Sequence, residues 1–92
     1  MQYTLIQTNR AKRDLKHFKK SNKKLYEKIK EGLYNIQIDP YNADNIQLKS
    51  NKCPKCRRYR VGNYRIIYYV NSSQKIIEII NIIPRRNDYS QY

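Results

Sequence analysis

The stretch from Arg57 to Ile83, RRYRVGNYRIIYYVNSSQKIIEIINII, decides the fold of this 92-residue chain. It holds three runs of β-branched and aromatic residues, at 58–61, 64–70 and 75–83, which are separated by Gly62-Asn63 and by residues 71–74. Eight of the thirteen isoleucines fall within it. Runs of this length between turn residues predict three consecutive antiparallel strands, a meander at the buried centre of the protein.

The part of the chain before this stretch predicts a strand and two helices. Residues 2–8 alternate apolar and polar side chains, as a strand does. The first helix follows a cap at Thr8 or Asn9, and the second follows a cap at Ser21 and ends before Pro40, because the residue before a proline avoids the helical conformation. The apolar residues at helical spacing are Ala11, Leu15 and Phe18 in the first helix and Leu25, Ile29, Leu33 and Ile36 in the second.

The predicted order of elements is therefore β-α-α-β-β-β. This is an α+β fold in which a helical hairpin packs on an antiparallel-meander sheet, in a single domain spanning residues 1–92. Residues 41–56 are polar and rich in turn residues, and they predict an irregular connection.

Leu, Ile, Val and Phe make up 21 of the 92 residues. That fraction lies just above the roughly 20% below which a highly charged chain is expected to be disordered, so we expect a folded protein with a thin core.

The net charge of +13 points to a polyanionic partner. RNA, DNA, an anionic membrane surface and an acidic protein all fit a charge excess of this size. No apolar run is long enough for a membrane-spanning helix, and the N-terminus does not resemble a signal peptide, so we expect a cytoplasmic protein without a membrane partner. Ten basic residues lie between positions 10 and 30, which favours RNA binding over a merely solvated helix face. Of these, the candidate RNA-binding residues are Lys16, Lys19, Lys20, Lys23 and Lys24.

The first hairpin of the meander places like charges together. If Gly62-Asn63 is a two-residue turn, Arg60 lies directly across from Arg65, on the same face as Arg58. Like charges opposite each other on a sheet are unfavourable. A phosphate site explains them, because guanidinium groups bind phosphate oxygens in pairs and stabilise developing negative charge. The alternative is a solvated basic face.

At these residues the chain resembles the RelE/ParE toxin superfamily. Residues 58–68, RYRVGNYRIIY, resemble the signature R-x-R-V-G-x-Y-R-x-x-Y. Upstream, Leu48-Lys49 resembles the L-K that precedes the sheet, and residues 84–89, PRRNDY, resemble the H-R-R-x-x-Y ending. The resemblance covers nearly the whole chain and implies the RelE-like microbial RNase fold.

RelE-like members are toxins of type II toxin–antitoxin pairs, so the resemblance implies an activity and its partners. They are endoribonucleases that cut messenger RNA at the ribosome without a metal or other cofactor, and a cognate antitoxin inhibits them. The implied reaction is attack of a ribose 2′-hydroxyl on the neighbouring phosphate. By position, Arg58 and Arg60 fall where members carry Lys or Arg, and Arg65 matches the phosphate-clamping arginine. Arg85 matches the C-terminal catalytic arginine, and Tyr89 matches the aromatic residue that stacks on a base.

Two departures from the family pattern leave the general base open. The frequent histidine before the C-terminal arginine is Pro84 here, and the guanidinium groups of Arg58 and Arg60 do not readily give up a proton. Either a lysine of the preceding connection reaches the site, or catalysis is mostly electrostatic. The lysines in question, which are also candidate RNA-binding residues, are Lys49, Lys52 and Lys55.

Two further functions are compatible with the same chain. One is a ParE-like, non-catalytic toxin that inhibits DNA gyrase, and the other is a small basic RNA-binding protein without toxicity. The arginine cluster together with Arg85 and Tyr89 favours the ribonuclease, because ParE-like chains generally lack that constellation.

Other candidate features have simpler interpretations. Cys53 and Cys56 have the spacing of a zinc knuckle or a redox pair, but with His17 they give too few ligands for zinc. We expect a reduced turn there and no metal site, although a metal or contact shared between two chains is an alternative. His17 is expected on the surface. We expect sheet packing rather than base stacking from three tyrosines, Tyr64, Tyr68 and Tyr69.

Overall fold

The computed structural model describes residues 3–41, 46–47 and 55–84. Its elements are β1 (Thr4–Gln7), α1 (Asn9–Ser21), α2 (Lys23–Ile38), β2 (Ile46–Gln47), β3 (Arg57–Val61), β4 (Tyr64–Asn71) and β5 (Ile76–Pro84). The predicted order of one strand, two helices and three strands is confirmed. Within the connection that was expected to be irregular, the two-residue strand β2 is an addition, and it pairs with the start of β3.

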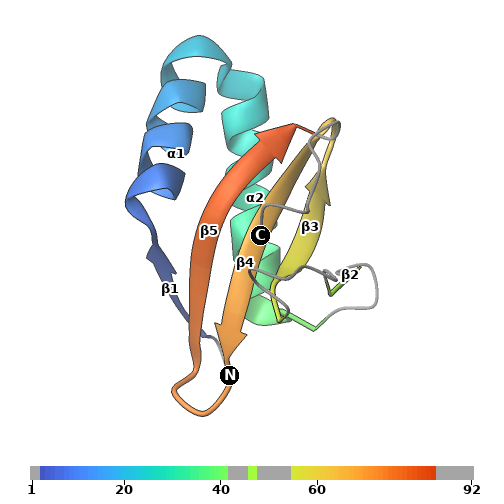
Figure 1. Cartoon of the computed structure of the whole chain (residues 1–92). Helices are drawn as coiled ribbons and strands as arrows, with labels where there is room; N and C mark the ends of the chain where they lie inside the picture. Colours follow the sequence, from blue (N-terminus) through green and yellow to red (C-terminus); the bar gives the residue numbers. More distant parts are fainter. Residues whose placement is uncertain (1–2, 42–45, 48–54, 85–92) are drawn as a thin grey trace.

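The strands form one sheet in the order β1-β5-β4-β3-β2, and both helices lie on the same face of it (Figure 1). Strands β3, β4 and β5 are the predicted antiparallel meander. The sheet as a whole is mixed, because β1 runs parallel to β5 at its edge. Within the described residues, neither helix has the length and apolar character needed to cross a membrane.

Side-chain caps set the start of each helix. The Thr8 hydroxyl accepts a hydrogen bond from the backbone N–H of Ala11 at 3.1 Å, as predicted for a cap at this position. The cap predicted at Ser21 is wrong, because Ser21 is the last residue of α1 and its hydroxyl donates to the His17 carbonyl at 2.8 Å. Asn22 caps α2 instead, through its side-chain oxygen.

The main core lies between the helices and the sheet. Ile29, Leu33 and Ile36 of α2 are buried there, as their spacing predicted. The helix approaches the sheet closely at Gly32, where a β-carbon would lie 2.9 Å from the Tyr59 ring. A smaller cluster lies on the opposite face of the sheet and is formed by Cys56, Ile67 and Ile83, with Tyr69 and Ile80 packed against them.

A β-bulge in β5 ties α1 to the sheet. Ile67 pairs with Asn81 and Tyr68 with Ile79, so Ile80 is the extra residue. The Ile80 carbonyl accepts a hydrogen bond from the hydroxyl of Thr8, the residue that also caps α1. Asp14 of α1 accepts a hydrogen bond from the backbone N–H of Ile82 at 3.1 Å. The first helix is thus fixed against the irregular part of the strand.

Candidate functional site

The β3–β4 hairpin has the predicted register. Arg60 pairs with Arg65 and Val61 with Tyr64, which leaves Gly62-Asn63 as the two-residue turn. Gly62 has a φ of 57°, which favours glycine. A positive φ at the first central position only is typical of the type II′ turn that matches the twist of a hairpin.

Three arginines of this hairpin lie on the sheet face opposite the helices. Tyr59, Val61 and Ile66 face α2, because they are the side chains closest to Gly32. Side chains alternate along a strand, so their neighbours point the other way. The residues on that helix-free face are Arg58, Arg60, Arg65 and Ile67.

The arginines differ in burial. Arg65 is only 3% exposed, whereas Arg58 is half-buried and Arg60 is exposed. Arg65 lies between Arg60 on β3 and the buried Ile83 on β5, and one guanidinium nitrogen donates to the Tyr64 carbonyl at 3.1 Å. Arg65 is therefore part of the packed sheet as well as of the arginine cluster.

The other candidates for the catalytic set are two C-terminal residues and three lysines of the connection before β3. Arg85, Tyr89, Lys49 and Lys52 are outside the described residues. Lys55 is described and exposed, and it precedes β3. Lys55 lies near the start of β3, whereas Arg60 lies near its other end, beside the turn. The structure therefore does not bring Lys55 together with the Arg60–Arg65 pair.

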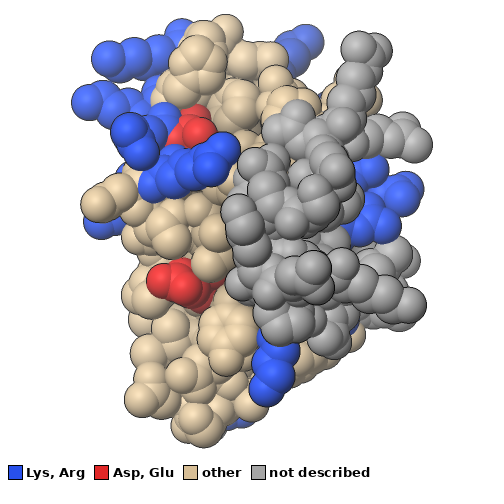
Figure 2. Space-filling model, viewed as in Figure 1, with Lys and Arg blue, Asp and Glu red and all other residues tan. Residues whose placement is uncertain are grey.

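The basic residues between positions 10 and 30 are all exposed. Figure 2 shows Lys and Arg side chains gathered over α1, with few acidic side chains among them. The candidate RNA-binding lysines lie at the end of α1 and at the start of α2, so they form one surface around the turn between the helices: Lys16, Lys19, Lys20, Lys23 and Lys24. His17 is exposed there, as expected.

Cys56 is fully buried and belongs to a disulfide bond, so the expected reduced state is wrong for this residue. Cys53 lies outside the described residues. In the part of the chain that the structure describes, His, Cys, Asp and Glu side chains do not form a group of three or more that would hold a metal ion.

Two of the three tyrosines of β4 pack as predicted. Tyr68 is fully buried and donates a hydrogen bond to the Pro40 carbonyl at 2.7 Å. The ring of Tyr64 meets that of Phe18 edge to face, with 5.1 Å between centroids. Tyr69 is half-buried, and part of it lines a cavity that also includes Tyr41 and Arg57. Sequence patterns did not indicate this cavity, because its lining comes from three separate segments.

Solved structures share this fold. A toxin in an archaeal RelE–RelB complex from Pyrococcus horikoshii OT3 superimposes with a TM-score of 0.76 at 26% identity, over 96% of this chain and 100% of that one. A chain of a YoeB dimer from Staphylococcus aureus gives a TM-score of 0.72 at 26% identity, over 90% of this chain and 97% of that one. A YoeB/ParE toxin from Agrobacterium tumefaciens gives a TM-score of 0.79 at 20% identity, over 88% of this chain and 96% of that one. The expected RelE-like fold is confirmed.

A comparison with curated protein sequences gives no significant match. Residues 5–89 match the model of a protein family described as the ParE toxin of the type II toxin–antitoxin system parDE. Because that match spans most of the chain, the protein belongs to the ParE toxin family and is a type II toxin of the RelE/ParE superfamily, as its hairpin motif predicted.

Proposed function

We propose that this toxin is an endoribonuclease that cuts messenger RNA at the ribosome without a metal. The observation that carries the proposal is the cross-strand pair of Arg60 and Arg65 on the helix-free face of the sheet. Like charges directly opposite each other weaken a hairpin, and the Gly62-Asn63 turn does not require arginine at either position. Binding of a phosphate at this place explains both.

The chemistry follows from the charges that develop during the cut. The substrate's own 2′-hydroxyl loses its proton and attacks the neighbouring phosphate, and negative charge grows on the non-bridging oxygens. Arg60 and Arg65 stabilise these oxygens. The bond from phosphorus to the 5′-oxygen then breaks, and the 5′-oxygen takes up a proton. Arg85 stands by the leaving 5′-oxygen, and Tyr89 holds a base so that the attack is in line, roles that come from the resemblance to RelE-like toxins.

The exposed lysines around the turn between α1 and α2 serve a second purpose in this proposal. They lie on the helical side of the molecule, whereas the arginines of the hairpin lie on the helix-free face. A surface of this kind binds ribosomal RNA through phosphate contacts and positions the arginine face over the messenger.

A cognate antitoxin is the second partner that we propose. The solved relatives include toxins in RelE–RelB and YoeB–YefM complexes. An acidic or amphipathic antitoxin segment over the arginines lowers the self-repulsion of a chain with a charge of +13 and excludes RNA at the same time. High-yield production of the isolated chain without growth arrest contradicts both the partner and the toxicity.

The family match favours one alternative, a ParE-like toxin that inhibits DNA gyrase, because the matching family is described as the ParE toxin. Inducible expression in a bacterium with labelled precursors separates the two. We expect incorporation of amino acids to stop first and DNA synthesis to continue. An early stop of DNA synthesis with intact messenger RNA contradicts the ribonuclease and supports gyrase inhibition.

A further inference from the structure

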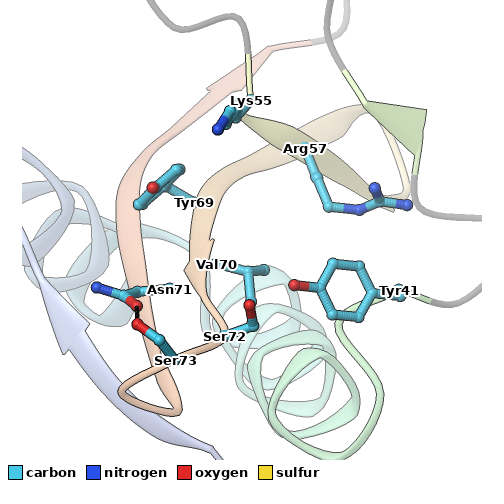
Figure 3. A pocket seen from close by; sticks show the side chains of 8 residues that line it. All are labelled: Tyr41, Lys55, Arg57, Tyr69, Val70, Asn71, Ser72 and Ser73. Atoms are coloured by element: carbon cyan, nitrogen blue, oxygen red, sulfur yellow. Dashed lines mark hydrogen bonds between the residues drawn. The ribbon is translucent and has the colours of Figure 1, made fainter.

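A cavity of about 440 Å³ lies beside β4, at the end of the strand away from the arginine hairpin. Its volume falls within the range of sites for small ligands, roughly 300 to 1,000 Å³. Figure 3 shows the side chains around it, with Lys55 and Arg57 at one end, Asn71, Ser72 and Ser73 at the other, and the rings of Tyr41 and Tyr69 on opposite sides of Val70.

The charged side chains that line this cavity are positive in the part of the chain that the structure describes. Among the described residues, its lining contains Lys55 and Arg57 and does not include an aspartate or glutamate. The guanidinium carbon of Arg57 lies 5.3 Å from the centroid of the Tyr41 ring, so a cation–π contact holds this charge at the rim. An anionic group fits at this end of the cavity.

The rest of the lining suits a nucleoside better than an apolar peptide side chain. Tyr41 is 49% exposed and Tyr69 is half-buried, so both present ring surface. Asn71, Ser72 and Ser73 line the same cavity, and within the described part of the chain Val70 is its single aliphatic lining residue. Aromatic rings beside cationic groups bind single-stranded nucleic acid by stacking on bases and pairing with phosphates.

We propose that this cavity is a subsite for single-stranded RNA, which crosses the edge of β4 with one base against the Tyr69 ring and its phosphates on Lys55 and Arg57. As a subsite for the substrate strand, the inference rests on the ribonuclease proposal. Tyr69 lies four residues from Arg65 on the same face of β4, roughly 13 Å away at about 3.3 Å per residue. One RNA strand that follows β4 therefore reaches both places.

The test measures binding of a fluorescent 2′-O-methyl RNA oligonucleotide to the full chain, without any cleavage step. Tyr69→Leu removes the ring and keeps apolar packing, and it is expected to weaken binding about 5- to 150-fold. Tyr69→Phe retains the ring and the affinity. Tyr34→Leu, at an exposed tyrosine of α2 that does not line the cavity, leaves binding unchanged.

Equal affinity of the Leu and Phe variants, with melting temperatures at the level of the unmodified chain, overturns the subsite. Competition by a polyglutamate peptide that is equally strong in all the tyrosine variants also overturns the subsite, because it indicates an acidic protein as the occupant. Cleavage of unmodified messenger RNA by the unmodified chain tests the ribonuclease proposal separately. Ring-dependent binding without cleavage supports the subsite and contradicts the ribonuclease.

Discussion

Arg60 of β3 lies directly opposite Arg65 of β4, and the first side chain is exposed whereas the second is buried. The pair stands beside a type II′-like turn that requires only Gly62 to adopt its positive φ. Two like charges at such a position weaken the hairpin, and a bound phosphate reverses their effect. Removing the exposed one of these two charges is therefore expected to raise the stability of the protein and to lower its activity.

Replacing Arg60 with glutamine is the direct test of this opposition. We expect R60Q to stabilise the protein by about 0.2 to 1 kcal/mol, toward the lower end because Arg60 is exposed. RNA cleavage should slow by about 10²- to 10³-fold. Urea denaturation and single-turnover cleavage measure the two effects. R10Q removes the same charge from the exposed surface of α1 and is the control, and equal stabilisation by both variants contradicts a local repulsion.

Two substitutions of the buried Arg65 distinguish the effect of its packing from the effect of its charge. Arg65→Ala loses the packing of the aliphatic stem beside Ile67 and Ile83, and we expect a loss of about 1 to 3 kcal/mol. Arg65→Met keeps most of that volume and loses the hydrogen bond to the Tyr64 carbonyl, so it should be destabilised less than Arg65→Ala. Both variants should lose cleavage. Full activity of Arg65→Met would show that the guanidinium does not contact the phosphate.

The proposed nucleophile makes the cut independent of added metal and dependent on the substrate ribose. Fragments should carry a 2′,3′-cyclic phosphate and a 5′-hydroxyl, and a 2′-deoxy substitution at the cut site should stop the reaction. Arg85→Ala should slow the step by about 10²- to 10³-fold. Mass spectrometry of the fragments, with and without a chelator, tests this. Cleavage of the 2′-deoxy substrate, or loss of cleavage with the chelator, contradicts the mechanism.

The lysines around the helix turn should affect binding and leave the chemical step intact. Replacing the five with glutamine should weaken association with ribosomes, because fewer counterions are released from the RNA. The dependence of log K on log salt should become shallower by about 0.7 to 0.9 for each phosphate that the protein no longer neutralises. Cleavage at saturating protein should persist. Loss of turnover with binding intact would contradict this separation of roles. The five residues are Lys16, Lys19, Lys20, Lys23 and Lys24.

Gly32→Ala should destabilise the protein, although the same change in an open helix stabilises by roughly 1 kcal/mol. The new β-carbon would meet the Tyr59 ring at 2.9 Å and Val61 at 3.1 Å. Overpacking of this kind typically costs about 1 to 3 kcal/mol. The Tyr59 ring is held in place, because its hydroxyl accepts a hydrogen bond from Asn35 at 2.9 Å. Thermal unfolding with K28A as the exposed control on α2 measures the effect, and a raised melting temperature would contradict it.

Local features of the sequence predicted most of the fold. The isoleucine-rich runs and the Gly62-Asn63 turn indicated the meander and its register, because alternation and turn length together specify which residues face each other. The cap of the second helix was misplaced by one residue, at Ser21 instead of Asn22. Both side chains are able to cap a helix, and only the end of the first helix decides between them.

The sequence by itself determined the strand order along the chain, the pairing of Arg60 with Arg65 and the basic surface of the helices. Tertiary structure alone decided how deeply each arginine is buried, because that depends on β5 and its isoleucines beside β4. It also decided that β1 joins the sheet parallel to β5, a pairing between distant segments that no local pattern encodes. The cavity between Tyr41, Arg57 and Tyr69 arises for the same reason, since its walls come from segments that only folding brings together.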